Sequence, residues 1–110
     1  MLDKSEWEER LKETDQKYNF PMGYKLLFCP WDTLQTKCEV ALISLNPSGN
    51  VPKEADLRTI SDEKGNSYII EKETTQSPIT HQIFMLFQFL RIDPSKTITG
   101  VLCPFRSISW

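Results

Sequence analysis

The stretch from residue 77 to residue 102 constrains the fold of this chain more than any other. Ser77 is a typical N-cap, and Pro78 suits the first helical position. Apolar residues then recur at helical spacing: Ile79, Ile83, Leu86, Phe87 and Leu90. A strand-like run at 97–102 follows this helix, and another at 38–45 precedes it. The order strand, helix, strand predicts a βαβ unit with parallel strands.

The remaining elements fit the same class of fold. The run Val40-Ala41-Leu42-Ile43 is apolar without alternation, which is typical of a strand buried on both faces of a parallel sheet. An N-terminal helix is expected over residues 5–18, with Ser5 and Glu8 as a capping box, and a short strand over 24–28. We therefore predict an α/β fold with a short, mainly parallel sheet and flanking helices.

The length of 110 residues predicts a single domain, 1–110. Residues 50–77 form its least regular part and are expected to be an irregular excursion or a hairpin insertion. In the hairpin alternative, the turn at 62–66 joins strands at 58–61 and 67–71. An excursion that follows a strand end is a common place for a binding loop.

Composition narrows the class of function. The three cysteines lie far apart beside a single histidine, so we expect no metal, no cofactor and no disulfide framework. They are interpreted as buried or half-buried thiols: Cys29, Cys38 and Cys103. The phenylalanines of the 78–90 helix are expected on one broad buried face: Phe84, Phe87 and Phe89.

Charge and hydropathy indicate where such a chain works. No apolar run reaches the roughly 20 residues of a membrane helix, and the charged N-terminus is unlike a signal peptide. We therefore expect a cytoplasmic protein without a membrane partner. The formal net charge of -2 disfavours broad electrostatic binding to nucleic acid, since phosphate neutralisation supplies most of that affinity.

Two strand ends are expected to meet. If 38–45 and 97–102 are parallel neighbours, Leu45-Asn46-Pro47-Ser48-Gly49 and Cys103-Pro104-Phe105-Arg106-Ser107 follow them at the same edge of the sheet. Open α/β sheets bind ligands outside the carboxyl ends of their strands. The sequence therefore predicts a crevice at this edge, into which the Asn-Pro turn presents the Asn46 side chain and nearby backbone N–H groups.

These two motifs resemble the uracil-DNA glycosylase superfamily. The run S-L-N-P-S at residues 44–48 is similar to the G-x-N-P-G motif of that superfamily, and P-F-R-S at 104–107 ends the next strand of the sheet. The nearest likeness is to an uncharacterised bacterial branch with a G-L-N-P-S motif, in which a tyrosine and a Trp-Asp pair, here Tyr24 and Trp31-Asp32, come first. The resemblance covers roughly residues 24–110 and implies the first half of a three-layer sandwich.

The resemblance implies hydrolysis of an N-glycosidic bond in nucleic acid or in a nucleotide, as part of DNA repair. It assigns Asn46 to positioning the attacking water, as the catalytic residue. Phe105 would stack on the base, and Arg106 would contact phosphate. Backbone N–H groups near Ser48 and Gly49 would hold an anion. Pro47 and Ser107 complete the expected substrate-binding set.

The sequence departs from the family pattern at three places. Ser44 and Ser48 replace the two glycines of the motif, and Val101-Leu102-Cys103 stand where the family has a base-reading asparagine. The chain also ends at Trp110, before the later helices and strands of the superfamily. Open sheet edges would then invite a homodimer or a partner that covers them.

Each site residue has a structural alternative. Asn46 fits an ordinary Asn-Pro turn, Phe105 fits a core position, and Arg106 fits a surface ion pair. The alternative function is accordingly a non-catalytic module that binds a nucleotide or a protein in the same crevice.

Overall fold

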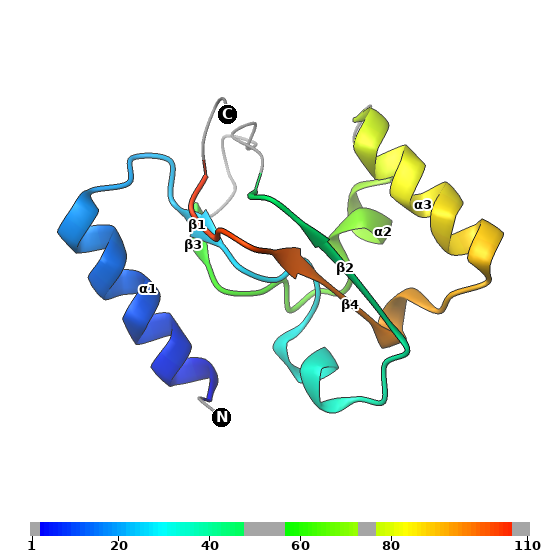
Figure 1. The fold of residues 1–110 in the computed structure, drawn as a ribbon, viewed down its shortest axis with the longest axis horizontal. Helices are drawn as coiled ribbons and strands as arrows, with labels where there is room; N and C mark the ends of the chain where they lie inside the picture. Colours follow the sequence, from blue (N-terminus) through cyan, green and yellow to red (C-terminus); the bar gives the residue numbers. More distant parts are fainter. Residues whose placement is uncertain (1–2, 48–56, 73–76, 107–110) are drawn as a thin grey trace. The chain divides into compact units, whose positions relative to one another are not determined.

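A computed structural model describes residues 3–47, 57–72 and 77–106 (Figure 1). The elements follow in the order α1 (Lys4–Tyr18), β1 (Tyr24–Lys25), the 3₁₀ helix η1 (Trp31–Gln35), β2 (Val40–Ser44), β3 (Arg58–Thr59), α2 (Ser67–Glu71), α3 (Pro78–Leu90), the 3₁₀ helix η2 (Pro94–Lys96) and β4 (Thr97–Val101). The described residues contain helices and two short parallel strand pairs, β1 with β3 and β2 with β4, so the predicted α/β class is confirmed.

The chain divides into two compact units, and each takes its residues from separate stretches of the sequence. The first unit contains residues 1–26, 44–60 and 101–110, and the second contains 27–43 and 61–100. The single domain expected over the whole chain stays a prediction.

Helix α1 of the first unit begins one residue earlier than expected. Asp3 is its N-cap, and the Asp3 carboxylate accepts a hydrogen bond from the Glu6 amide at 2.9 Å. The Ser5 hydroxyl donates to the same carboxylate at 2.8 Å, so the predicted Ser5 capping box is wrong. A carboxylate is as good an N-cap as a hydroxyl, and its charge also suits the positive end of the helix dipole. Asn19 ends the helix in the left-handed conformation.

Strand β1 pairs in parallel with β3, in the register Tyr24 to Arg58 and Lys25 to Thr59. The expected hairpin over 58–71 is therefore wrong, because 58–59 pairs with β1 and residues 67–71 form helix α2. The asparagine before α2 explains this difference: the Asn66 side chain accepts a hydrogen bond from the Tyr68 amide and caps a helix.

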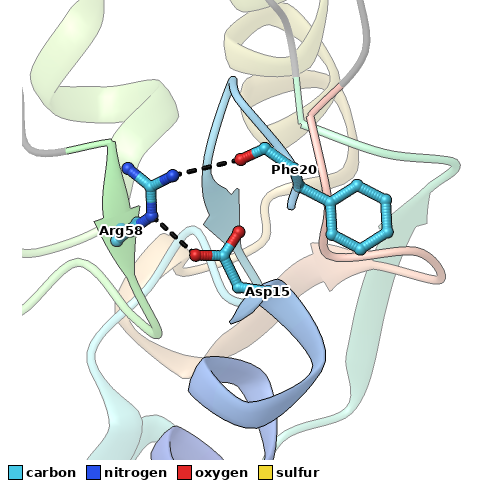
Figure 2. A network of polar contacts seen from close by, with 3 residues as sticks. All are labelled: Asp15, Phe20 and Arg58. Atoms are coloured by element: carbon cyan, nitrogen blue, oxygen red, sulfur yellow. Dashed lines mark hydrogen bonds and ion pairs between the residues drawn. The ribbon is translucent and has the colours of Figure 1, made fainter. Parts of the chain in front are cut away.

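A polar network holds β3 against the end of α1 (Figure 2). The Arg58 guanidinium donates from Nε to the Asp15 carboxylate at 2.8 Å and from Nη2 to the Phe20 carbonyl oxygen at 3.0 Å. The Asp15 side chain is only 12% exposed. One arginine thus neutralises a nearly buried carboxylate and satisfies a carbonyl just beyond the helix.

In the second unit, β2 pairs with β4, and α3 lies between them in sequence (Figure 1). The predicted βαβ unit with parallel strands is confirmed. Helix α3 spans the predicted residues, with Ser77 as N-cap and Pro78 in its first turn. Its C-terminus is set by Arg91 in the left-handed conformation, two residues before the expected Asp93-Pro94 stop.

Strand β4, and not β2, is the buried strand of this pair. The prediction that β2 is buried on both faces is therefore wrong. Thr97 and Thr99 of β4 are 0% exposed, whereas Ala41 and Ile43 of β2 are exposed. The Phe28 amide donates to the Thr99 carbonyl oxygen at 2.8 Å, so β4 has a backbone neighbour besides β2. Among the described strands, β2 pairs only with β4, and its alternating side chains are covered on one face only.

Helix α3 is also less covered than its sequence suggests. Phe87 is buried, but Phe89 is 84% exposed, so the expected single buried face of Phe84, Phe87 and Phe89 is wrong. The covered side packs against α2, where the Lys72 ammonium lies 3.7 Å from the centre of the Phe84 ring.

The cysteines differ in burial. Cys29 is buried and Cys38 is half-buried, but Cys103 is exposed, which corrects the interpretation of all three as covered thiols. Among the helices of the described ranges, none is long and apolar enough to cross a membrane.

Candidate functional site

The two predicted strand ends lie side by side. Beyond β2 and β4, the Leu102 amide donates to the Ser44 carbonyl oxygen at 2.9 Å, and the Cys103 amide donates to the Leu45 carbonyl oxygen at 2.9 Å. All four residues belong to the first unit. Parallel strands in this register bring the segments that follow them to one edge, as the sequence predicted.

The Asn46-Pro47 turn is anchored by its proline. Pro47 is less than 2% exposed and is among the most completely buried side chains of the described residues. Asn46 just before it is half-buried. Burial of the ring fixes the backbone of the turn, because proline already restricts its own φ and the residue before it. Pro47 was expected among the substrate-binding residues, but its ring is buried, so only its backbone is left to shape the turn.

Phe105 packs against other aromatic rings. It stacks on Phe20 with the ring centres 4.1 Å apart and an interplanar angle of 17°, and it meets Tyr24 edge-on at 6.1 Å. Tyr24 itself is 3% exposed. Phe105 thus joins the core of the first unit, although the ring keeps an intermediate exposure. Most contacts of Phe105 therefore fit the structural alternative left open by the sequence, in which this residue is part of the core.

The backbone on either side of Phe105 is fixed by the segment around β1. The Lys25 amide donates to the Pro104 carbonyl oxygen at 2.8 Å, and the Arg106 amide donates to the Gly23 carbonyl oxygen at 3.0 Å. The Nε atom of Arg106 is buried. A guanidinium held partly inside the unit is restricted in its reach, so a phosphate contact would use its outer nitrogens.

The other expected site residues are distributed as follows. Ser48, Gly49 and Ser107 lie outside the described residues. Trp31 and Asp32, which carry part of the family resemblance, begin η1 in the second unit, where the Trp31 amide donates to the Glu63 carboxylate at 3.3 Å. The structure thus brings Asn46, Pro47, Phe105 and Arg106 into one unit, at the strand ends and around them.

A separate hollow in the second unit has no counterpart in the sequence predictions. Its volume is about 330 Å³, at the lower end for ligand pockets, and its lining includes Asn66, Ile69, Asp93 and Pro94. The sequence predicted Asn66 in a turn and Asp93 at the end of the 78–90 helix, whereas in the structure both are N-caps. No sequence signal indicates that the two residues line one hollow.

The polar groups of this hollow serve the fold. Asn66 donates to the Thr99 hydroxyl at 3.4 Å and accepts from the Tyr68 amide at 3.0 Å. The Ser95 hydroxyl and amide donate to the Asp93 carboxylate, and these hydrogen bonds lower the pKa of Asp93. In the parts of the chain that the structure describes, no group of three or more potential metal ligands is found.

Comparisons with protein-family models, curated proteins and solved structures give no match to this chain. The resemblance to uracil-DNA glycosylases therefore stays a prediction from the two motifs.

Proposed function

We propose that this chain is a uracil-DNA glycosylase-like protein that acts on a base in nucleic acid or in a nucleotide, with Asn46 as the residue that positions the attacking water. The observation that carries the proposal is the pair of backbone hydrogen bonds from Leu102 to Ser44 and from Cys103 to Leu45. They support the proposal because these hydrogen bonds hold the two motifs of the resemblance next to each other at the strand ends.

The chemistry required of such a site is limited. The transition state of N-glycosidic cleavage carries positive charge on the sugar, and the extruded base must be held while water attacks. An asparagine is a weak base, so its contribution is to orient water rather than to remove a proton. The fixed Asn-Pro turn supports this role, because positioning requires a rigid backbone.

The test measures base excision from labelled single- and double-stranded oligonucleotides that carry uracil, mismatched thymine or hypoxanthine. We expect excision by the unmodified chain and a loss of about 100-fold or more in Asn46→Ala, the scale typical of a lost positioning or stabilising group. Gln88→Ala is the matched control, because it removes an exposed side-chain amide from α3 in the other unit. Absence of excision by protein shown to be folded by circular dichroism would remove catalysis from this chain.

A second function, a non-catalytic module that binds a nucleotide or a protein, is favoured by one specific observation. Phe105, the expected stacking platform, is stacked on Phe20 instead. A base would have to share or displace this contact. For this candidate we expect fluorescence anisotropy to show binding of a labelled uracil-containing single strand without cleavage. Asn46→Ala would weaken that binding, and Gln88→Ala would leave it unchanged.

A further inference from the structure

The ring expected to carry a base is already stacked on another ring of the same unit. The Phe20 and Phe105 rings are nearly parallel, with an interplanar angle of 17° and ring centres 4.1 Å apart. A base on a phenylalanine platform makes the same face-to-face contact, because every base has a flat π face. Both rings keep an intermediate exposure, whereas Tyr24, which meets Phe105 edge-on, is 3% exposed. The stacked pair therefore reaches the surface of the first unit.

Phe20 is held on Phe105 by contacts outside the strand pairs. It lies between α1 and β1, and its carbonyl oxygen accepts hydrogen bonds from the Arg58 guanidinium at 3.0 Å and from the Gly23 amide at 3.4 Å. The same guanidinium donates to the Asp15 carboxylate at 2.8 Å (Figure 2). Side-chain bonds of this kind open without breaking a helix or a strand pair, so the segment can move while the unit stays folded.

All of these residues belong to the first unit. We propose that the Phe20 ring occupies the place of the substrate base on Phe105, so that a base stacks there only after Phe20 has moved aside. The Asp15–Arg58 pair acts as a positioning element that keeps Phe20 in place. The inference rests on the proposed function, because it takes Phe105 as the stacking platform. An internal ring that competes with the base lowers the apparent affinity by the fraction of molecules in which the platform is open.

The direction of the change in affinity separates this role from a structural one. Removing a residue that only supports the site weakens base binding, whereas removing an internal competitor strengthens it. The strength of an aromatic pair predicts a gain of about two- to tenfold in Phe20→Ala. Arg58→Gln should give a smaller gain, because the Phe20 ring remains and loses only its backbone anchor, and the melting temperature should fall.

The test is an NMR titration of the full chain with 2′-deoxyuridine over about 0.1–20 mM, which spans millimolar affinities. A nucleoside carries no phosphate, so the charge removed in Arg58→Gln does not change binding through a phosphate contact. We expect tighter binding by Phe20→Ala, and the gain should disappear in the double variant Phe20→Ala and Phe105→Leu. Phe89→Ala is the matched control, because it removes the same ring from α3 in the other unit and should leave the affinity unchanged.

An affinity that is equal or lower in Phe20→Ala overturns the proposal, and so does the absence of binding in every variant. Circular dichroism melting checks that the compared proteins are folded. If Phe20→Ala unfolds, Phe20→Leu replaces it, since leucine keeps apolar volume without a flat ring. Unfolding of both variants would make Phe20 a purely structural residue and would also overturn the proposal.

Base excision by the same proteins distinguishes this proposal from the proposed function. Excision by the unmodified chain without a gain in Phe20→Ala leaves the proposed function standing and removes the role of Phe20. A gain in binding without excision by any variant keeps the role of Phe20 and removes catalysis from the chain.

Discussion

At the first turn of α1, the Asp3 carboxylate accepts hydrogen bonds from the Glu6 amide and from the Ser5 hydroxyl. The hydrogen bond from the Glu6 amide has the larger effect and that from the Ser5 hydroxyl the smaller. Both stabilise the ionised carboxylate and so lower the pKa of Asp3 below its ordinary value of 3.8. A group whose pKa is lower in the folded chain than in the unfolded chain stabilises the fold above its unfolded pKa. That stabilisation is lost as the pH falls through the folded pKa.

Asp3→Asn tests this linkage. Asparagine keeps the cap but does not titrate, so as the pH falls below the ordinary pKa of 3.8 the free energy of unfolding should decrease less steeply than in the unmodified chain. The change is partial, because the pKa of Asp93 is lowered as well, mainly by Ser95. Urea unfolding at a series of pH values measures the slope. The control Glu9→Gln removes an exposed carboxylate from the same helix, and an equal flattening there would contradict the assignment to the cap.

Gly23 occupies a position that no other residue fits. Its φ of 76° lies in the left-handed region, and a Cβ atom there would collide with the backbone carbonyl group of Leu57. Gly65 also has a positive φ, of 142°, but a Cβ atom there would meet only the Ile70 side chain, at 3.5 Å. Replacing either glycine would therefore strain the backbone, but only at position 23 would the new side chain also clash with another backbone segment.

We expect Gly65→Ala to lower the free energy of unfolding by about 1–3 kcal/mol, from strain alone. Gly23→Ala should cost about 1–3 kcal/mol more, because the β1–β3 segment must shift to relieve the overlap. Denaturant unfolding of both variants gives the comparison. Equal losses would mean that Leu57 moves aside without cost.

Among the elements, α2 depends on one side chain for both its start and its attachment. Asn66 is 8% exposed, caps the helix through the Tyr68 amide and donates to Thr99 in the buried strand β4. The sequence predicted Asn66 in a hairpin turn and residues 67–71 in a strand. It indicated neither the cap nor the second partner, since Thr99 lies far along the chain.

Two substitutions separate these roles. Asn66→Asp keeps an oxygen for the Tyr68 amide and removes the donor to Thr99, whereas Asn66→Ala removes both. We expect Asn66→Ala to lower the free energy of unfolding by about 1–3 kcal/mol, the sum of a lost cap and a lost buried hydrogen bond. Asn66→Asp also gives up the donor but retains the cap, and hydrogen exchange of the α2 amides should stay closer to the unmodified rate. Equal exchange in the two variants would contradict the capping role.

The contrast between β2 and β4 shows which properties of an element are local. The positions of β2 and β4 and the full extent of α3 were predictable, because periodicity, Ser77 and Pro78 are signals within a few residues. The strand expected over 24–28 covers only Tyr24–Lys25. Burial was not, because it depends on the neighbours of each strand. The run Val40–Ile43 is more apolar than Thr97–Gly100, yet the threonines of β4 are buried, since Phe28 also binds that strand.

For the molecule as a whole, the same limit applies to the candidate site. Adjacent strand ends followed from the βαβ order, and the structure places them together at Ser44 and Leu102. The engagement of Phe105 with Phe20 did not follow, because Phe20 belongs to a segment after α1 with no periodic link to residue 105. The proposed role of Asn46 comes from the family resemblance of its motif, which is a property of the sequence and not of the packing.

The discontinuous make-up of the first unit has a consequence for how the protein is made. Its N-terminal segment is held by contacts with residues that leave the ribosome much later. The Lys25 amide forms its hydrogen bond only once Pro104 has been made, and the Phe20 ring stacks only once Phe105 has been made. Closing such distant contacts is slow, because most of the chain must be ordered around them. Helix α1 therefore emerges well before its unit can close, and that unit closes only after Pro104 and Phe105 have been synthesised.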